Sequence, residues 1–155
     1  MQTLLTAIVT WLSINAGLPA THDLPRIEFV SPAEMYVVRV GAHAPGHPPA
    51  AMATSGREVR DNAMHSIVAL YDNRTRTIYL RQDWTGATPA ELSVLVHEMA
   101  HHLQNVAGLK YDCAEAREKL AYEAQKKWLA LYGRDLMKEF ELDPFTLILR
   151  TNCMH

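Results

Sequence analysis

The chain has 155 residues, of which 48% are hydrophobic. This length is enough for one domain with a buried core and too short for two domains of typical size. Its 15 Lys and Arg and 17 Asp and Glu give a net charge of −2, with no long run of either sign. This balance, and the lack of a nucleic-acid-binding motif, argue against nucleic acid as a partner. Beyond the N-terminus no apolar run approaches the roughly 20 residues that span a bilayer, so we expect no integral membrane segment. The composition predicts a single domain over residues 1–155.

The N-terminal segment contains an apolar run that supports two interpretations. The run fits the core of a signal peptide, but no Lys or Arg precedes Arg26, so the positively charged start of such a peptide is missing. Leu4, Ile8 and Leu12 also recur at helical spacing, as in an amphipathic helix that packs on the rest of the chain. We prefer a packed helix over residues 1–17, and the compartment stays open between the cytoplasm and the periplasm.

A short strand and a short helix are expected next. Residues 26–30 alternate like a strand, and the segment from Ser31 to Glu34 carries the signature of a helix start. This signature predicts a helix through Val38. Residues 41–56 are rich in proline and small residues, and they predict a loop.

Two β-prone runs follow, over residues 67–71 and 77–81. The residues between them favour turns, and their number is typical of the loop between hairpin strands. The sequence therefore predicts a β-hairpin.

The C-terminal half is expected to be helical. Thr88 is a helix N-cap, Pro89 suits the first turn, and Glu91 stands at the third position, so a helix begins here and runs until Gly108. Further helices are expected over residues 113–132, 136–140 and 145–149. With the hairpin, these helices indicate an α+β fold.

Cys113 and Cys153 lie outside any metal-binding pattern, because neither belongs to a CxxC pair or has a histidine at ligand spacing. A disulfide between them would tie the C-terminal tail to the start of the second long helix, and would indicate an exported protein. Two free thiols in a cytoplasmic enzyme are an equally acceptable interpretation.

The sequence feature that indicates a chemical function is an HExxH motif on the helix that begins near Thr88. At 3.6 residues per turn, His97 and His101 project from one face, close enough to share one zinc ion. Glu98 points about 100° around the helix from His97. That offset keeps Glu98 off the metal but beside a water molecule there, where its carboxylate can act as a general base.

This motif seldom arises by accident. With 8 His in 155 residues, roughly 0.03 matches are expected by chance in a sequence of this composition. The alternative is a helix with histidines on its surface. Apolar residues around the motif argue against that alternative, because they bury the helix and keep water from the site. They are Leu92, Leu95, Val96, Met99 and Leu103.

A catalytic zinc site normally needs a third protein ligand. No histidine follows at the spacing of the longer HExxHxxGxxH motif, so a carboxylate is expected to fill this role. The next carboxylates along the chain are Asp112, Glu115, Glu118 and Glu123.

Helical geometry favours Glu118 among these carboxylates. The apolar stripe of the second long helix comprises Leu120, Ala121, Ala124, Trp128 and Leu131, and it must face the core. Glu118 flanks this stripe, whereas Glu123 projects from the opposite side and Glu115 lies farther round. The small Ala121 also lets two helices approach closely. We choose Glu118, with Glu115 and Glu123 as the alternatives.

The other histidines are not expected to bind the metal. His102 lies about 140° off the face that carries the ligands, so a supporting or surface role is expected. Four other histidines are isolated in the sequence, and each is expected to be solvated or part of the core. They are His43, His47, His65 and His155.

This set of residues resembles the gluzincin branch of zinc metallopeptidases, in which an HExxH helix is followed by a helix that carries a ligand Glu with Ala three residues later. It is also similar to a family of small, uncharacterised bacterial HExxH proteins. The similarity covers about residues 88–133. It implies zinc bound by His97, His101 and Glu118, and Glu98 as general base. It also implies that a strand beside the active helix, here residues 77–81, binds extended peptide.

One departure from the gluzincin pattern concerns the aromatic residues. Tyr122 stands where family members often have Asp. Tyr111 and Tyr122 are candidate oxyanion or proton donors, but aromatic residues in such positions more often serve packing, so we leave both out of the catalytic set.

The sequence thus predicts a zincin-like α+β domain with Zn²⁺ as cofactor, acting as a hydrolase on a peptide or protein substrate. The alternative is a module that binds zinc or peptide without catalysis. The substrate, the mode of cleavage and the oligomeric state stay open at this point.

Overall fold

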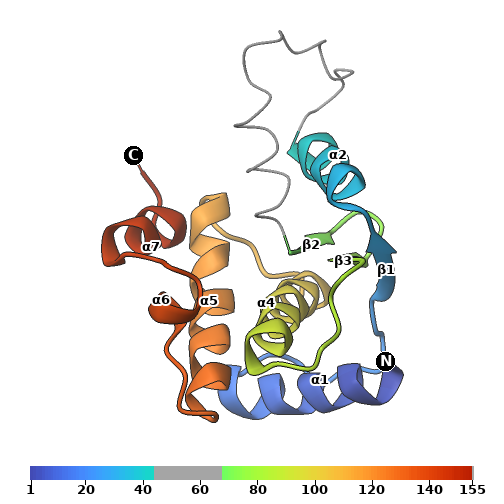
Figure 1. Cartoon of the computed structure of the whole chain (residues 1–155), viewed down its shortest axis with the longest axis horizontal. Coiled ribbons are helices and arrows are strands. Elements are labelled where there is room, and N and C mark those ends of the chain that lie inside the picture. The colour runs from blue at the N-terminus through green and yellow to red at the C-terminus, as the bar shows by residue number, and fades with distance from the viewer. Residues whose placement is uncertain (44–67, 155) are drawn as a thin grey trace, which may run out of the picture. The chain divides into compact units, whose positions relative to one another are not determined.

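The computed structural model describes residues 1–43 and 68–154, except for the side chains of residues 41–43. The fold class is α+β, as predicted. The elements in chain order are α1 (Gln2–Ala16), β1 (Arg26–Val30), α2 (Pro32–His43), β2 (Ala69–Asp72), β3 (Thr77–Arg81), α4 (Pro89–Val106), α5 (Ala114–Ala130), α6 (Leu136–Glu139) and α7 (Pro144–Thr151) (Figure 1).

The chain divides into two compact units. One unit comprises Met1–Pro25 and Thr85–His155, and the other comprises Arg26–Trp84. The first, called the helical unit below, contains α1 and α4 to α7, and the second, called the sheet unit, contains the strands and α2. The sequence-based prediction of a single domain stays a prediction.

The sheet unit contains the predicted hairpin. β2 pairs with β3 in antiparallel fashion, from Ala69 opposite Leu80 to Asp72 opposite Thr77. β1 pairs with the other side of β3 in parallel, which gives the strand order β1-β3-β2 among the described residues. β3 is therefore the central strand, and the expectation that residues 77–81 offer a substrate edge is wrong. Both sides of its backbone are already occupied by neighbouring strands.

The helix α2 begins where the sequence predicted it. The backbone N–H of Ser31 donates to Glu34 Oε2 over 2.8 Å, and the N–H of Glu34 donates to Ser31 Oγ over 3.2 Å. The helix continues to His43, beyond the predicted end at Val38. Residues 41–43, predicted as the start of a loop, are therefore helical. The rest of the predicted loop, residues 44–56, lies outside the described residues.

Local signals also define α4 in the helical unit. Thr88 caps the helix through a reciprocal pair in which the Glu91 N–H donates to Thr88 Oγ1 over 3.1 Å and the Thr88 N–H donates to Glu91 Oε2 over 3.2 Å. Gly108 follows the helix end with a φ of +65°, a left-handed conformation that suits glycine. Both predicted ends of α4 are confirmed to within two residues.

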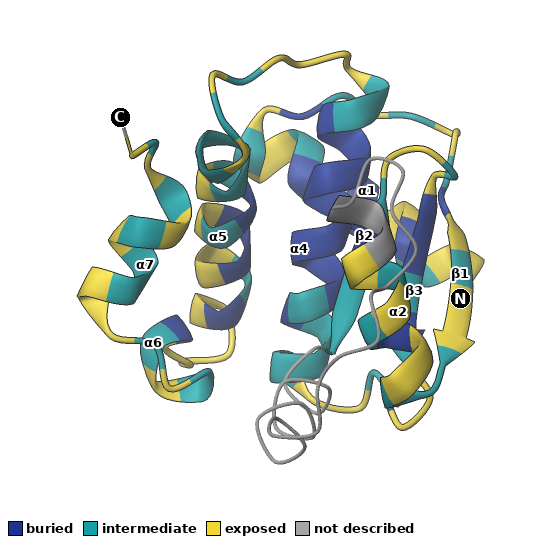
Figure 2. Cartoon of the chain, turned by 90° about the horizontal axis from the view of Figure 1, so that it is seen from above, coloured by how far each residue is buried: buried dark blue, intermediate teal, exposed yellow. Residues whose placement is uncertain are grey.

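The core of the helical unit lies around α4. α1 contacts both α4 and α5, and its residues Leu5, Ile8, Val9 and Leu12 are buried. α4 and α5 lie side by side, and α4 is buried along much of its length (Figure 2). The N-terminal segment is thus a helix that packs on α4 and α5, and the choice against a signal peptide stays a prediction.

The buried face of α5 differs in part from the predicted stripe. Ala121, Ala124, Gln125 and Leu129 are buried, whereas Leu131 is 63% exposed. Leu131 is the C-cap residue, just past the last residue of α5, and Leu129 occupies the core position near this end. The prediction for Leu131 was therefore wrong.

His102 belongs to the core of the helical unit and not to its surface. Its side chain is fully buried, and its Nε2 lies 2.6 Å from the backbone oxygen of Asp23. This contact joins α4 to the segment that follows α1.

A disulfide joins Cys113 to Cys153, so the two cysteines are not free thiols, and the compartment stays a prediction. Cys113 is the N-cap residue of α5, and Cys153 lies two residues after the end of α7. The bond therefore fixes the C-terminal segment to the start of α5, and α7 contacts α5 as well. None of the helices in residues 1–43 and 68–154 is long and apolar enough to cross a membrane.

Removing this disulfide should destabilise the protein. Because the bond spans 40 residues of sequence, the Cys113→Ser/Cys153→Ser double variant should lose about 2 to 4 kcal/mol of unfolding free energy. Urea unfolding followed by circular dichroism measures the difference. Wild-type protein in reductant should resemble the double variant, and equal stability of oxidised wild type and variant would contradict the prediction.

Candidate metal centre

Two imidazoles from α4 meet at one point in the helical unit. His97 and His101 lie one turn apart on the helix, and their Nε2 atoms are 3.2 Å from each other. Their ring centroids are 4.9 Å apart, with the planes at 79°. The one-turn spacing of the motif thus brings two potential ligand atoms together, as the sequence predicted.

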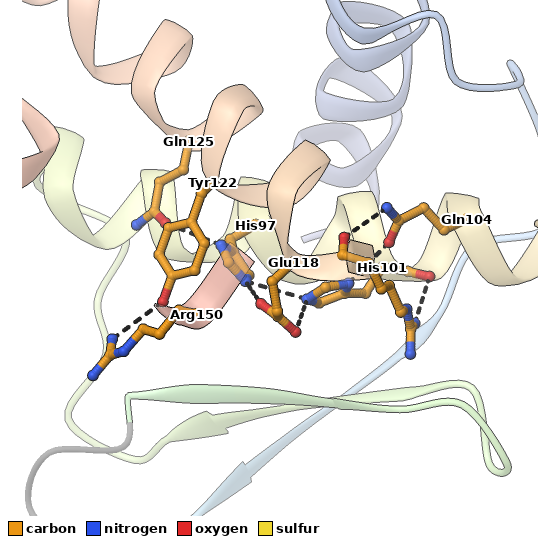
Figure 3. A network of polar contacts seen from close by, with 8 residues as sticks. His97, His101, Gln104, Glu118, Tyr122, Gln125 and Arg150 are labelled. Carbon is orange, nitrogen blue, oxygen red and sulfur yellow. Dashed lines mark hydrogen bonds and ion pairs between the residues drawn. The ribbon is translucent and has the colours of Figure 1, made fainter. Parts of the chain in front are cut away.

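The neighbouring helix α5 adds a carboxylate to this pair (Figure 3). Glu118 Oε2 is 3.0 Å from His97 Nε2, and Glu118 Oε1 is 3.2 Å from His101 Nε2. The three residues form a group whose ligand atoms lie within 4.8 Å of one another. Glu115 and Glu123 do not belong to this group, and Glu123 is exposed to solvent.

The hydrogen bonds of the imidazoles leave both Nε2 atoms available to a cation. His97 Nδ1 lies 3.0 Å from Gln125 Oε1, and His101 Nδ1 lies 2.9 Å from Gln104 Oε1. An amide oxygen only accepts hydrogen bonds, so each Nδ1 carries the hydrogen and each Nε2 presents a lone pair. Histidine ligands of metals commonly have such a partner on the second ring nitrogen.

The distances between these lone-pair atoms fit a small tetrahedral ion. Bonds of about 2.0 to 2.1 Å to nitrogen and oxygen ligands separate neighbouring ligand atoms by about 3.3 Å in a tetrahedron. The observed separations of 3.0, 3.2 and 3.2 Å are close to this value. The residues present therefore fit a zinc-sized ion.

The two glutamines are themselves held in place. Gln125 Nε2 donates to Ser93 Oγ on α4 over 3.2 Å, and Gln104 Nε2 donates to the backbone oxygen of Arg117 over 3.0 Å. Arg117 in turn donates to the backbone oxygen of His101 over 3.1 Å. These bonds cross between α4 and α5, so the partners of the imidazoles cannot rotate freely.

The electrostatics of the centre favour an ionised carboxylate. Partial burial opposes ionisation of Glu118, but in the metal-free protein protonated His101 and His97 donate to it and add positive charge, and together they hold the pKa of this carboxyl well below its usual range. The imidazole side chains are only 11% and 8% exposed, whereas that of Glu118 is 35% exposed. The centre therefore opens to solvent on the carboxylate side, where a further ligand can reach it.

Glu98, the predicted general base, lies one residue after His97 on α4 and is buried, with 8% of its surface exposed. It does not belong to the group of ligand atoms, and its role as general base stays a prediction.

Sequence reasoning left three nearby residues out of the site. Gln104 and Gln125 bond to the imidazoles, and Tyr122 places its ring edge-on to His97 with centroids 4.7 Å apart. Helical spacing gives a weak indication of the two glutamines, because it places each on the same helix face as a ligand. Gln104 lies three residues after His101, and Gln125 lies seven residues after Glu118. Of the isolated histidines, His47, His65 and His155 lie outside the described residues, as does the side chain of His43.

Comparisons with curated proteins, solved structures and family models place the chain among known proteins. No curated protein and no solved structure matches it. A family model does match: it carries the description Domain of unknown function (DUF6647) and aligns with residues 1–155. Since this match spans the whole sequence, the protein belongs to the DUF6647 family.

Proposed function

We propose that the protein is a zinc-dependent hydrolase, and specifically a peptidase, on a zincin-like scaffold. The observation that carries the proposal is the convergence of His97, His101 and Glu118 from two adjacent helices. Two imidazoles and one carboxylate are the ligand set of several catalytic zinc sites, which keep a fourth position open. The partly exposed Glu118 side chain agrees with such an open position.

The donor set and its surroundings support zinc as the cofactor. Imidazole nitrogen suits zinc, and the spacing of the ligand atoms suits a tetrahedral ion. When bound, zinc acidifies a water molecule and polarises a carbonyl group. Gln104 and Gln125 orient the imidazoles as metal ligands. The carboxyl group of Glu118 is ionised at neutral pH and supplies a negative charge.

Glu98 is the residue that would move the proton. It follows the first ligand directly on α4, and a carboxylate in this position accepts a proton as water attacks the substrate and later returns it to the leaving group. Its burial limits competition from bulk water. The resemblance to gluzincins assigns the same role to this residue and favours a peptide bond as the bond that is cut.

The ligand assignment predicts which substitutions remove the metal. Glu118→Ala and His101→Ala should each weaken zinc binding more than about 100-fold, because loss of a ligand costs more than loss of a residue that merely supports one. Elemental analysis of purified protein, followed by competition with a chromogenic chelator, measures this. Glu115→Ala and Glu123→Ala are the matched controls and should retain one equivalent of zinc. Retention of full affinity by Glu118→Ala would refute the assignment.

The supporting amides predict a smaller effect. Gln125→Leu preserves the approximate volume but removes the acceptor for His97 Nδ1, so zinc affinity should fall about 10- to 100-fold. The same chelator competition measures this change. The exposed neighbour Lys126 provides the control Lys126→Leu, and equal affinities of these two variants would show that the amide has no role in metal binding.

The role of Glu98 predicts a separation between metal binding and turnover. Glu98→Gln should keep its zinc and lose about 10²- to 10⁴-fold in hydrolytic rate, because only the proton acceptor is removed. Cleavage of a mixed peptide library by zinc-loaded protein, read by mass spectrometry, measures the rate. Glu123→Gln on the exposed side of α5 is the control. An unchanged rate in Glu98→Gln would sink the catalytic role, and no cleavage by the wild type would favour a zinc- or peptide-binding module without catalysis.

A further inference from the structure

The helix α7 brings a guanidinium close to the candidate metal centre. Arg150, in the last turn of α7, donates from Nη1 to the hydroxyl oxygen of Tyr122 over 3.2 Å. Tyr122 in turn places its ring edge-on to His97, with centroids 4.7 Å apart and planes at 78°. Figure 3 shows Arg150, Tyr122, His97, Glu118 and His101 as a row of side chains, with Arg150 at the end beside Tyr122.

The two polar groups at this end of the row both have hydrogens to donate. Arg150 is exposed, and no carboxylate among the described residues pairs with it, whereas Arg134 of the same unit is paired with Glu139 over 2.9 Å. The Tyr122 hydroxyl accepts from Arg150, and its own hydrogen has no acceptor within residues 1–43 and 68–154. A guanidinium and a hydroxyl hydrogen together match the oxygen atoms of a carboxylate.

The backbone that carries this guanidinium is anchored at both ends of α7. Asp143 caps the start of the helix by accepting from the N–H of Thr146 over 2.9 Å. Past the end of α7, Cys153 is bonded to Cys113, the N-cap of the helix that carries Glu118 and Tyr122. Such anchoring lowers the backbone entropy that α7 loses when Arg150 binds a ligand.

We propose that Arg150, supported by Tyr122, forms a subsite that binds a carboxylate of the substrate next to the metal centre. Arg suits this task because its planar fork of donors matches the two oxygens of a carboxylate. The inference rests on the proposed function and names its substrate class: peptides that carry a carboxylate near the bond that is cut. The carboxylate comes either from the peptide C-terminus or from an acidic side chain.

Peptide hydroxamates test the subsite without turnover, because the hydroxamate group binds zinc by itself. Three probes of equal length are compared: one with a free C-terminal carboxylate, one with a C-terminal amide, and one with a C-terminal amide and an adjacent Asp side chain. Isothermal titration calorimetry measures their affinities for wild type, Arg150→Gln and Arg134→Gln, each with and without zinc. Arg134→Gln is the control, because it removes an equal charge from an exposed site of the same unit.

We expect at least one of the two carboxylate probes to bind zinc-loaded wild type about tenfold more tightly than the neutral amide, and the tighter of the two identifies the source of the carboxylate. Arg150→Gln should lose this preference while binding the neutral amide as wild type does, and Arg134→Gln should keep it. Equal zinc-dependent binding of all three probes to wild type, or a preference that survives in Arg150→Gln, would overturn the subsite alone. If no probe shows zinc-dependent binding, the proposed function fails and the subsite with it.

Discussion

The packing of α4 against α5 is the constraint on which the candidate site depends. α4 alone brings two imidazoles one turn apart, and α5 alone brings one carboxylate. Neither helix has enough ligands for a catalytic metal, since such a site takes three from the protein. Contact between the two helices places Glu118 within 3.2 Å of both Nε2 atoms, so the chemistry of the chain depends on this tertiary contact.

Burying polar side chains between α4 and α5 costs free energy, and the hydrogen bonds that these side chains form offset the cost. Ser93, Gln104 and Gln125 are all buried, and an unsatisfied buried amide or hydroxyl would cost roughly 1 to 3 kcal/mol. Each of the three finds a partner: Gln125 bonds to His97 and Ser93, and Gln104 bonds to His101 and to the backbone of α5. The same bonds that satisfy the core thus orient the imidazoles, so stability and site geometry share one set of contacts.

The sequence predicted those features that depend on a few neighbouring residues. The cap at Thr88 and the HExxH motif each involve residues within one or two helical turns. Glu118 was chosen as the third ligand from the direction in which its side chain projects from the second long helix. Features that depend on distant partners were beyond such reasoning. The parallel pairing of β1 with β3 joins segments about fifty residues apart in the sequence. Leu131 was wrongly assigned to the core because the sequence did not show the exact residue at which α5 ends.

The crossed bonds between Gln104, Arg117 and the backbone of His101 have a consequence for a metal ion bound at the candidate centre. They join α4 to α5 through groups of the protein alone, so the contact that aligns the candidate ligands uses no metal bond. In small zinc-dependent modules, by contrast, the apoprotein is unfolded and the ion provides the driving force for folding. If zinc binds here as proposed, the contacts between α4 and α5 do not depend on it, and a chelator should remove the ion without unfolding the protein.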